Sequence, residues 1–115
     1  MIETEWRFFK EDFRSQLFEQ WPDAVMRYAR LHQGSVDLDF ELPMHKSTLY
    51  GTLPHEGKWI SFSGDLADCA DFAVWCRMRV PTDESVLFCD ESVNRSLALQ
   101  LGTTPAEIIE VMGAP

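Results

Sequence analysis

Two sets of carboxylates have the residue types and spacing that could do chemistry. One set alternates with apolar residues and the other recurs at every third position: Asp37, Asp39 and Glu41, and Asp65, Asp68 and Asp71. Alternation predicts that the first set shares one face of a strand at a spacing of about 6.8 Å, and the second spacing predicts adjoining flanks of one helix. Like charges this close repel one another unless a cation or a basic surface neutralises them. Each set is therefore either solvated surface or part of an acidic patch that binds a basic partner, and we adopt the patch as our hypothesis.

A metal site is the enzymatic alternative for the first set. Mg²⁺ prefers carboxylate oxygens, so these three residues would suit a small metal-dependent phosphodiesterase. Such sites usually draw ligands from several elements, whereas alternation along one strand is typical of a solvent-facing pattern. The histidines His32, His45 and His55 have no ligand spacing, and Cys89 precedes two acids that would raise the pKa of its thiol. We therefore predict no enzyme, with no catalytic residue, no metal and no cofactor.

Three further residues, near a predicted turn at 54–57, are predicted to bind the partner: His55, Glu56 and Trp59. In the alternation of the strand that follows the turn, Trp59 falls on the polar side, opposite Ile60. A tryptophan on the polar side of a strand is either covered, here by the N-terminal helix, or is an anchor of the kind enriched at binding hot spots. Both interpretations stay open, and we include the turn in the predicted binding surface.

The net charge narrows the class of partner. The 115 residues contain 10 Lys+Arg and 19 Asp+Glu, for a formal charge of −9. Because this field repels phosphate, we predict no nucleic-acid binding. Residues 1–34 contain five basic and six acidic side chains, and residues 35–115 contain five basic and thirteen acidic ones. The excess charge therefore lies outside the N-terminal segment, in the part that holds both carboxylate sets.

The compartment is predicted from what the sequence lacks. It has no run of 18 apolar residues and no basic, apolar leader at its start, so we expect neither a membrane span nor a secretory signal. Its three cysteines, Cys69, Cys76 and Cys89, are an odd number without a C-x-x-C pair. Free thiols fit a reducing compartment, and we expect a cytoplasmic protein.

The elements that must position these residues form one α+β domain over residues 1–115. Apolar spacing predicts N-terminal helices over 3–33, broken at Pro22. The period then changes to two, which predicts an antiparallel meander. A helix that is apolar nearly all round is expected to be the central buried element. We expect five strands in a mainly antiparallel sheet, with the central helix between the third and fourth strands and a C-terminal helix at the end. The expected elements in chain order are strands 36–42, 48–53 and 58–63, helix 65–79, strands 86–89 and 96–101, and helix 105–112.

Several segments between residues 42 and 112 carry a resemblance to a known group of proteins. They are the hairpin 53–60, the helix 65–77, the strand that ends Phe88-Cys89-Asp90-Glu91, and the closing pattern Leu99-x-Leu101-x-Thr103-Thr104-x-x-x-Ile108. Their layout resembles small bacterial immunity proteins of contact-dependent growth-inhibition toxin systems. The resemblance implies a protein that binds one cognate toxin domain, often a nuclease with a basic cleft, and blocks it. A non-catalytic adaptor or regulatory domain is the alternative.

Overall fold

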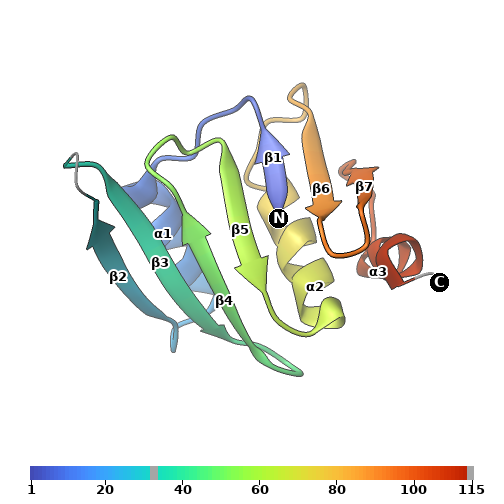
Figure 1. Ribbon diagram of the computed structural model, residues 1–115, viewed down its shortest axis with the longest axis horizontal. Helices are drawn as coiled ribbons and strands as arrows, with labels where there is room; N and C mark the ends of the chain where they lie inside the picture. Colours follow the sequence, from blue (N-terminus) through green and yellow to red (C-terminus); the bar gives the residue numbers. More distant parts are fainter. Residues whose placement is uncertain (32–33, 114–115) are drawn as a thin grey trace.

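An antiparallel sheet of seven strands is the framework of the protein, seen in a computed structural model that describes residues 1–31 and 34–113. The strands lie side by side in the order β2-β3-β4-β5-β1-β6-β7 (Figure 1). Their bounds are β1 Ile2–Thr4, β2 Val25–Arg30, β3 Val36–Pro43, β4 Thr48–Leu53, β5 Trp59–Ser63, β6 Val86–Asp90 and β7 Arg95–Ala98. The α+β class and the meander β3-β4-β5 are therefore confirmed.

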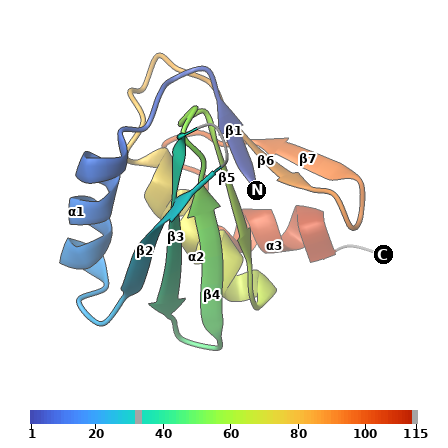
Figure 2. The ribbon, with the colours of Figure 1, turned by 60° about the vertical axis from the view of Figure 1, so that its left-hand side comes forward.

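Three helices accompany the sheet: α1 Lys10–Gln20, α2 Leu66–Arg77 and α3 Pro105–Gly113. Helices α1 and α2 lie behind the sheet in Figure 1, and α3 packs against α2 and β7. Figure 2 shows the same two layers from the side. No described helix covers the front of strands β2 to β5, and we call this surface the open face. No helix in the described residues is long and apolar enough to cross a bilayer.

The alternation in β3 produces the two faces of the sheet. Its apolar residues Leu38, Phe40 and Leu42 are all buried beneath the helices. Phe40 lies directly opposite Gly51 of β4, and a β-carbon at Gly51 would overlap the Phe40 ring. The missing side chain of the glycine is thus what lets the aromatic ring cross the neighbouring strand.

Helix α2 is the central buried element, as its composition predicted. Asp65 caps its N-terminus by accepting a hydrogen bond from the backbone amide of Ala67 at 2.9 Å. Phe72 is fully buried and stacks on Trp75 with the ring centroids 5.9 Å apart. The same Phe72 ring meets Phe62 of β5 edge-on at 4.9 Å. Aromatic packing therefore joins the helix to the middle of the sheet.

The N-terminal third differs from the prediction. The predicted helix ends at Gln20, and residues 25–30 form the edge strand β2, paired along its whole length with β3. A second strand, β1, begins at Ile2 and pairs with both β5 and β6. The sheet consequently has seven strands instead of five. His32, which the sequence placed near a helix end, lies outside the described residues.

Candidate functional site

The register of the meander assembles two cross-strand rows on the open face. Residues that pair directly point to the same face of a sheet. The rows run from β2 to β5 and consist of Val25, Glu41, Tyr50 and Ser63, and of Arg27, Asp39, Thr52 and Ser61. These eight residues surround a shallow hollow of about 340 Å³. Asp37 lies two residues before Asp39 on β3 and so points to the same face. The first carboxylate set therefore shares one face, as predicted.

Hydrogen bonds orient two of these carboxylates. The hydroxyl of Thr52 donates to Oδ1 of Asp39 at 2.8 Å, and the backbone amide of His55 donates to Oδ1 of Asp37 at 3.1 Å. The side chain of Asp37 is 18% exposed. In each of these two carboxylates, Oδ1 accepts a hydrogen bond from the protein. None of the described hydrogen bonds reaches the other oxygen. Arg27 is the cross-strand neighbour of Asp39 on β2 and contributes the one basic side chain of the two rows.

The predicted turn residues lie beside Asp37. The His55 ring lies with Nδ1 3.8 Å from Oδ1 of Asp37 and Nε2 3.4 Å from Oε1 of Glu56. The turn itself is closed by Gly57, which has a positive φ of 72° and whose carbonyl accepts from the Phe8 amide at 2.7 Å. The structure therefore brings His55 and Glu56 to the edge of the open face.

Aromatic side chains stand among the acids of the open face. Trp59 is 37% exposed and pairs with Glu3 of β1. The first helix packs behind the sheet, so it does not cover Trp59, and that interpretation was wrong. Tyr50 is 55% exposed and was missed from the sequence. Its position between Thr48 and Thr52, on the polar side of the strand alternation, is the signal that could have found it.

The second carboxylate set does not form a patch. Asp68 is 1% exposed, and its carboxylate accepts hydrogen bonds from the Lys46 amide at 3.0 and 3.2 Å and from the Ser47 hydroxyl at 2.7 Å. Asp65 is the helix cap, and Asp71 is exposed on α2, behind the sheet. Asp68 therefore joins α2 to the β3–β4 turn instead of facing a partner, and the two sets lie on opposite sides of the sheet.

The thiols are held in their neutral form. Burial raises the pKa of Cys69 to about 11 and raises the pKa of Cys76 well above its usual range. Burial, followed by the nearby carboxylate of Glu3, also raises the pKa of Cys89. Neutral thiols are weak nucleophiles. In residues 1–31 and 34–113, no three His, Cys, Asp or Glu side chains come together as a group that could hold a metal ion.

Comparison with protein-family models, with curated proteins and with solved structures found no match for this chain.

Proposed function

We propose that this protein is an immunity-type inhibitor that binds the basic surface of a toxin domain, such as a nuclease, through its open face. One observation carries the proposal. The open face presents Asp37, Asp39 and Glu41 along β3, with the exposed ring of Tyr50 beside Glu41 on β4 and the exposed ring of Trp59 one strand further, on β5. Oriented carboxylates with aromatic anchors on the neighbouring strands are suited to a cationic protein surface.

Electrostatics favours a basic partner over a neutral one. The chain carries a net charge of −9, and the three acids on the open face of β3 outnumber Arg27, the one basic side chain of the two cross-strand rows. Complementary fields speed the encounter of two proteins and select against partners of like charge. Carboxylates that enter a nuclease cleft also take the place of substrate phosphates. Blocking the cleft follows from the same contacts that give binding.

The experiment starts from the candidate partner encoded next to this gene. The product of the neighbouring reading frame is co-expressed with this chain, and the Kd of the purified pair is measured by calorimetry. A triple variant, Asp37→Asn, Asp39→Asn and Glu41→Gln, removes three charges and keeps the hydrogen-bond acceptors. A control triple, Glu11→Gln, Asp12→Asn and Glu19→Gln, makes the same charge change on the exposed side of α1.

The open-face triple is expected to weaken binding at least tenfold, and the α1 triple to leave the Kd within a factor of two. Equal affinities for the two triples would reject the open face as the interface. A tight complex that leaves the partner's activity unchanged would favour the adaptor or regulatory alternative. Turnover of a phosphodiester by this chain with Mg²⁺ or Mn²⁺ would favour the enzymatic alternative and overturn the proposal.

A further inference from the structure

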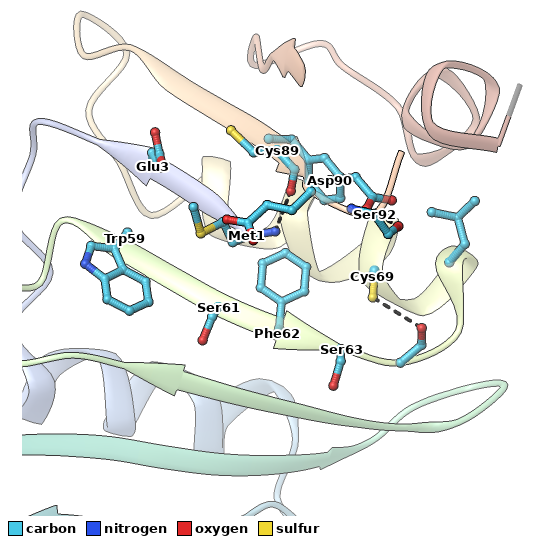
Figure 3. A pocket seen from close by; sticks show the side chains of 14 residues that line it. Met1, Glu3, Trp59, Ser61, Phe62, Ser63, Cys69, Cys89, Asp90 and Ser92 are labelled. Atoms are coloured by element: carbon cyan, nitrogen blue, oxygen red, sulfur yellow. Dashed lines mark hydrogen bonds between the residues drawn. The ribbon is translucent and has the colours of Figure 1, made fainter. Parts of the chain in front are cut away.

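Strand β2 forms one edge of the sheet, and it is a regular strand that pairs with β3 over six consecutive residues. In Figure 1 no described element lies on its outer side. The opposite edge strand, β7, has four residues and packs against α3. Inside the sheet, the backbone next to the short strand β1 is paired, because the amino group of Met1 donates to the carbonyl of Cys89 at 2.7 Å (Figure 3). A regular, uncovered edge such as that of β2 is a template on which another strand can pair.

The hydrogen bonds of the β2–β3 hairpin show which backbone groups of β2 point outward. The amide of Leu31 donates to the carbonyl of Ser35 at 2.9 Å, so the backbone of Leu31 faces β3. In an antiparallel pair every second residue faces the same neighbour, so residues 25, 27 and 29 also face β3. The N–H and C=O groups of Met26, Tyr28 and Arg30 therefore point away from the sheet. Outside the strand ladders, none of the described backbone hydrogen bonds uses them.

A second copy of β2 fits this edge in an antiparallel register about a two-fold axis at Tyr28. Tyr28 then exchanges backbone hydrogen bonds with its own copy, and Met26 exchanges them with Arg30 of the other copy. All the outward groups of both strands are paired in this register. An axis at Ala29 would instead carry Met26 past the end of the strand that it must pair with.

The same register matches apolar side chains across the axis. Val25 and Leu31 are 56% and 46% exposed, and each lies opposite the other residue in the second copy. The Tyr28 side chain is 45% exposed and lies opposite its own copy. Apolar and aromatic pairs directly across two strands stabilise their pairing. The three large exposed apolar side chains of residues 25–31 are therefore all covered by one contact.

Charge distinguishes this register from one shifted along the strand. An arginine on an edge strand opposes pairing where it meets a like charge. An axis at Arg27 would place the two Arg27 side chains opposite each other. With the axis at Tyr28, Arg27 lies opposite the small side chain of Ala29, and Asp37 of the second copy follows on the next strand. Arg27 is then placed between its own Asp39 and Asp37 of the second copy, so the charges alternate across the joined strands.

We propose that two copies of this chain associate through the edge of β2, antiparallel about a two-fold axis at Tyr28, so that their sheets become one. A single pair of strands makes a small interface, which is typical of a weak dimer. The axis is perpendicular to the sheet, so both open faces lie on the same side and stay uncovered. The association therefore does not depend on the proposed function.

Sedimentation equilibrium of the 115-residue chain, in about 0.15 M salt to screen the net charge, tests the association. The average mass is expected to rise above the 13.3 kDa of one chain as the concentration increases from about 10 µM to about 1 mM, with a dimer Kd of about 100 µM. A mass that stays at 13.3 kDa over this range would overturn the proposal. Because no partner protein is needed, the result stands whether the open face binds a toxin domain or not.

A charge variant tests the edge itself. Ala29→Arg places an arginine opposite Arg27 of the second copy and is expected to raise the dimer Kd at least tenfold. In its own chain Ala29 lies opposite Asp37, so the added charge does not oppose the pairing of β2 with β3. Ser63→Arg adds the same charge at an exposed position of β5, away from this edge, and should leave the dimer Kd within a factor of two. Equal Kd values for the two variants would reject β2 as the interface.

A mixed sample of ¹⁵N,¹³C-labelled and unlabelled parent chains tests the register without any substitution. Isotope-filtered spectra are expected to show contacts from Arg27 of one copy to Ala29 of the other, because this pair lies between hydrogen-bonded pairs, where the two strands approach most closely. Contacts between the two Arg27 residues would contradict an axis at Tyr28. Contacts between copies that involve only other surfaces would reject the β2 edge.

Discussion

Asp68 and Asp71 are one helical turn apart on α2, yet they have opposite roles. Asp68 is buried and accepts three hydrogen bonds from the β3–β4 turn, whereas Asp71 is exposed. A buried carboxylate is tolerated when donors surround it, and removing it leaves those donors unsatisfied. The second carboxylate set is therefore a mixture of cap, structural link and surface, and only the three-dimensional packing distinguishes them.

Because Asp68 is buried and hydrogen-bonded and Asp71 is exposed, we expect their replacement to change the stability of the protein by different amounts. Asp68→Ala is expected to lower the free energy of unfolding by about 2 kcal/mol, because the Lys46 amide and the Ser47 hydroxyl lose their acceptor. Asp71→Ala changes the same residue type on the same helix and is expected to stay within about 0.5 kcal/mol of the parent. Urea unfolding measures both. Equal losses would show that Asp68 does not hold the turn.

Gly51 gives a second prediction at the residue scale. Gly51→Ala places a β-carbon in the space of the buried Phe40 ring and is expected to cost about 2 kcal/mol of unfolding free energy. Gly102→Ala is the matched control, because a β-carbon there meets no atom within 4 Å. Thermal unfolding compares the two. A Gly51→Ala variant as stable as the control would mean that Phe40 can move away without cost.

The thiols make a third prediction. With a pKa of about 11, roughly one Cys69 thiol in a thousand is ionised at pH 8. In the native chain, Cys69 should therefore react slowly with an aromatic disulfide reagent at pH 8, and its labelling should speed up as the pH approaches 11. Unfolding in urea should expose all three cysteines to rapid reaction. Rapid native labelling of Cys69, located by peptide mapping, would contradict the buried neutral thiol.

At the element scale, strand β2 differs most clearly from the prediction, because the sequence predicted a helix in this segment. Its residues Val25, Tyr28 and Ala29 have a spacing of three and four, which is typical of a helix face. The same segment pairs with β3 over six residues, with Arg27 opposite Asp39. Tertiary pairing overrides a short periodicity, and Pro22 marks the end of α1 instead of a kink.

The parts that could be predicted share a physical reason. Strand β3 alternates over seven residues and α2 carries its own cap, so local signals are strong at both. Strand β1 has three residues, too few for a period, and its place depends on β5 and β6, which are distant in sequence. On the open face, the alternation of β3 could predict that its acids share a face. Their alignment with Tyr50 depends on a register that only the fold supplies.

Chemical shifts test the assignment of β2. The Cα shifts of residues 25–30 are expected to lie on the strand side of their random-coil values, and cross-strand contacts are expected between Met26 and Phe40. A continuous helix through this segment would move those shifts in the opposite direction. That outcome would remove Val25 and Arg27 from the open face and with them one edge of the proposed binding surface.

At the scale of the whole molecule, the helices form the core with one face of the sheet, and the open face remains exposed. Aromatic packing between α2 and the sheet fills the core, and this leaves the front of β2 to β5 without a helical layer. The net charge of −9 then acts on the approach of a partner. We expect the association rate constant to fall about tenfold between 0.05 and 0.5 M salt, with the dissociation rate changing less. An association rate that does not depend on salt would show that the partner is not steered electrostatically.

The most direct measurement is the footprint of the bound partner on this chain. Amide shifts of the ¹⁵N-labelled protein are compared before and after it binds the product of the neighbouring reading frame. We expect the changes to concentrate on the open face and its edge, at residues 25–30, 37–41, 50–55 and 59–63. Changes concentrated on α1 and α2, with the open face unaffected, would contradict the proposal that the open face binds the partner.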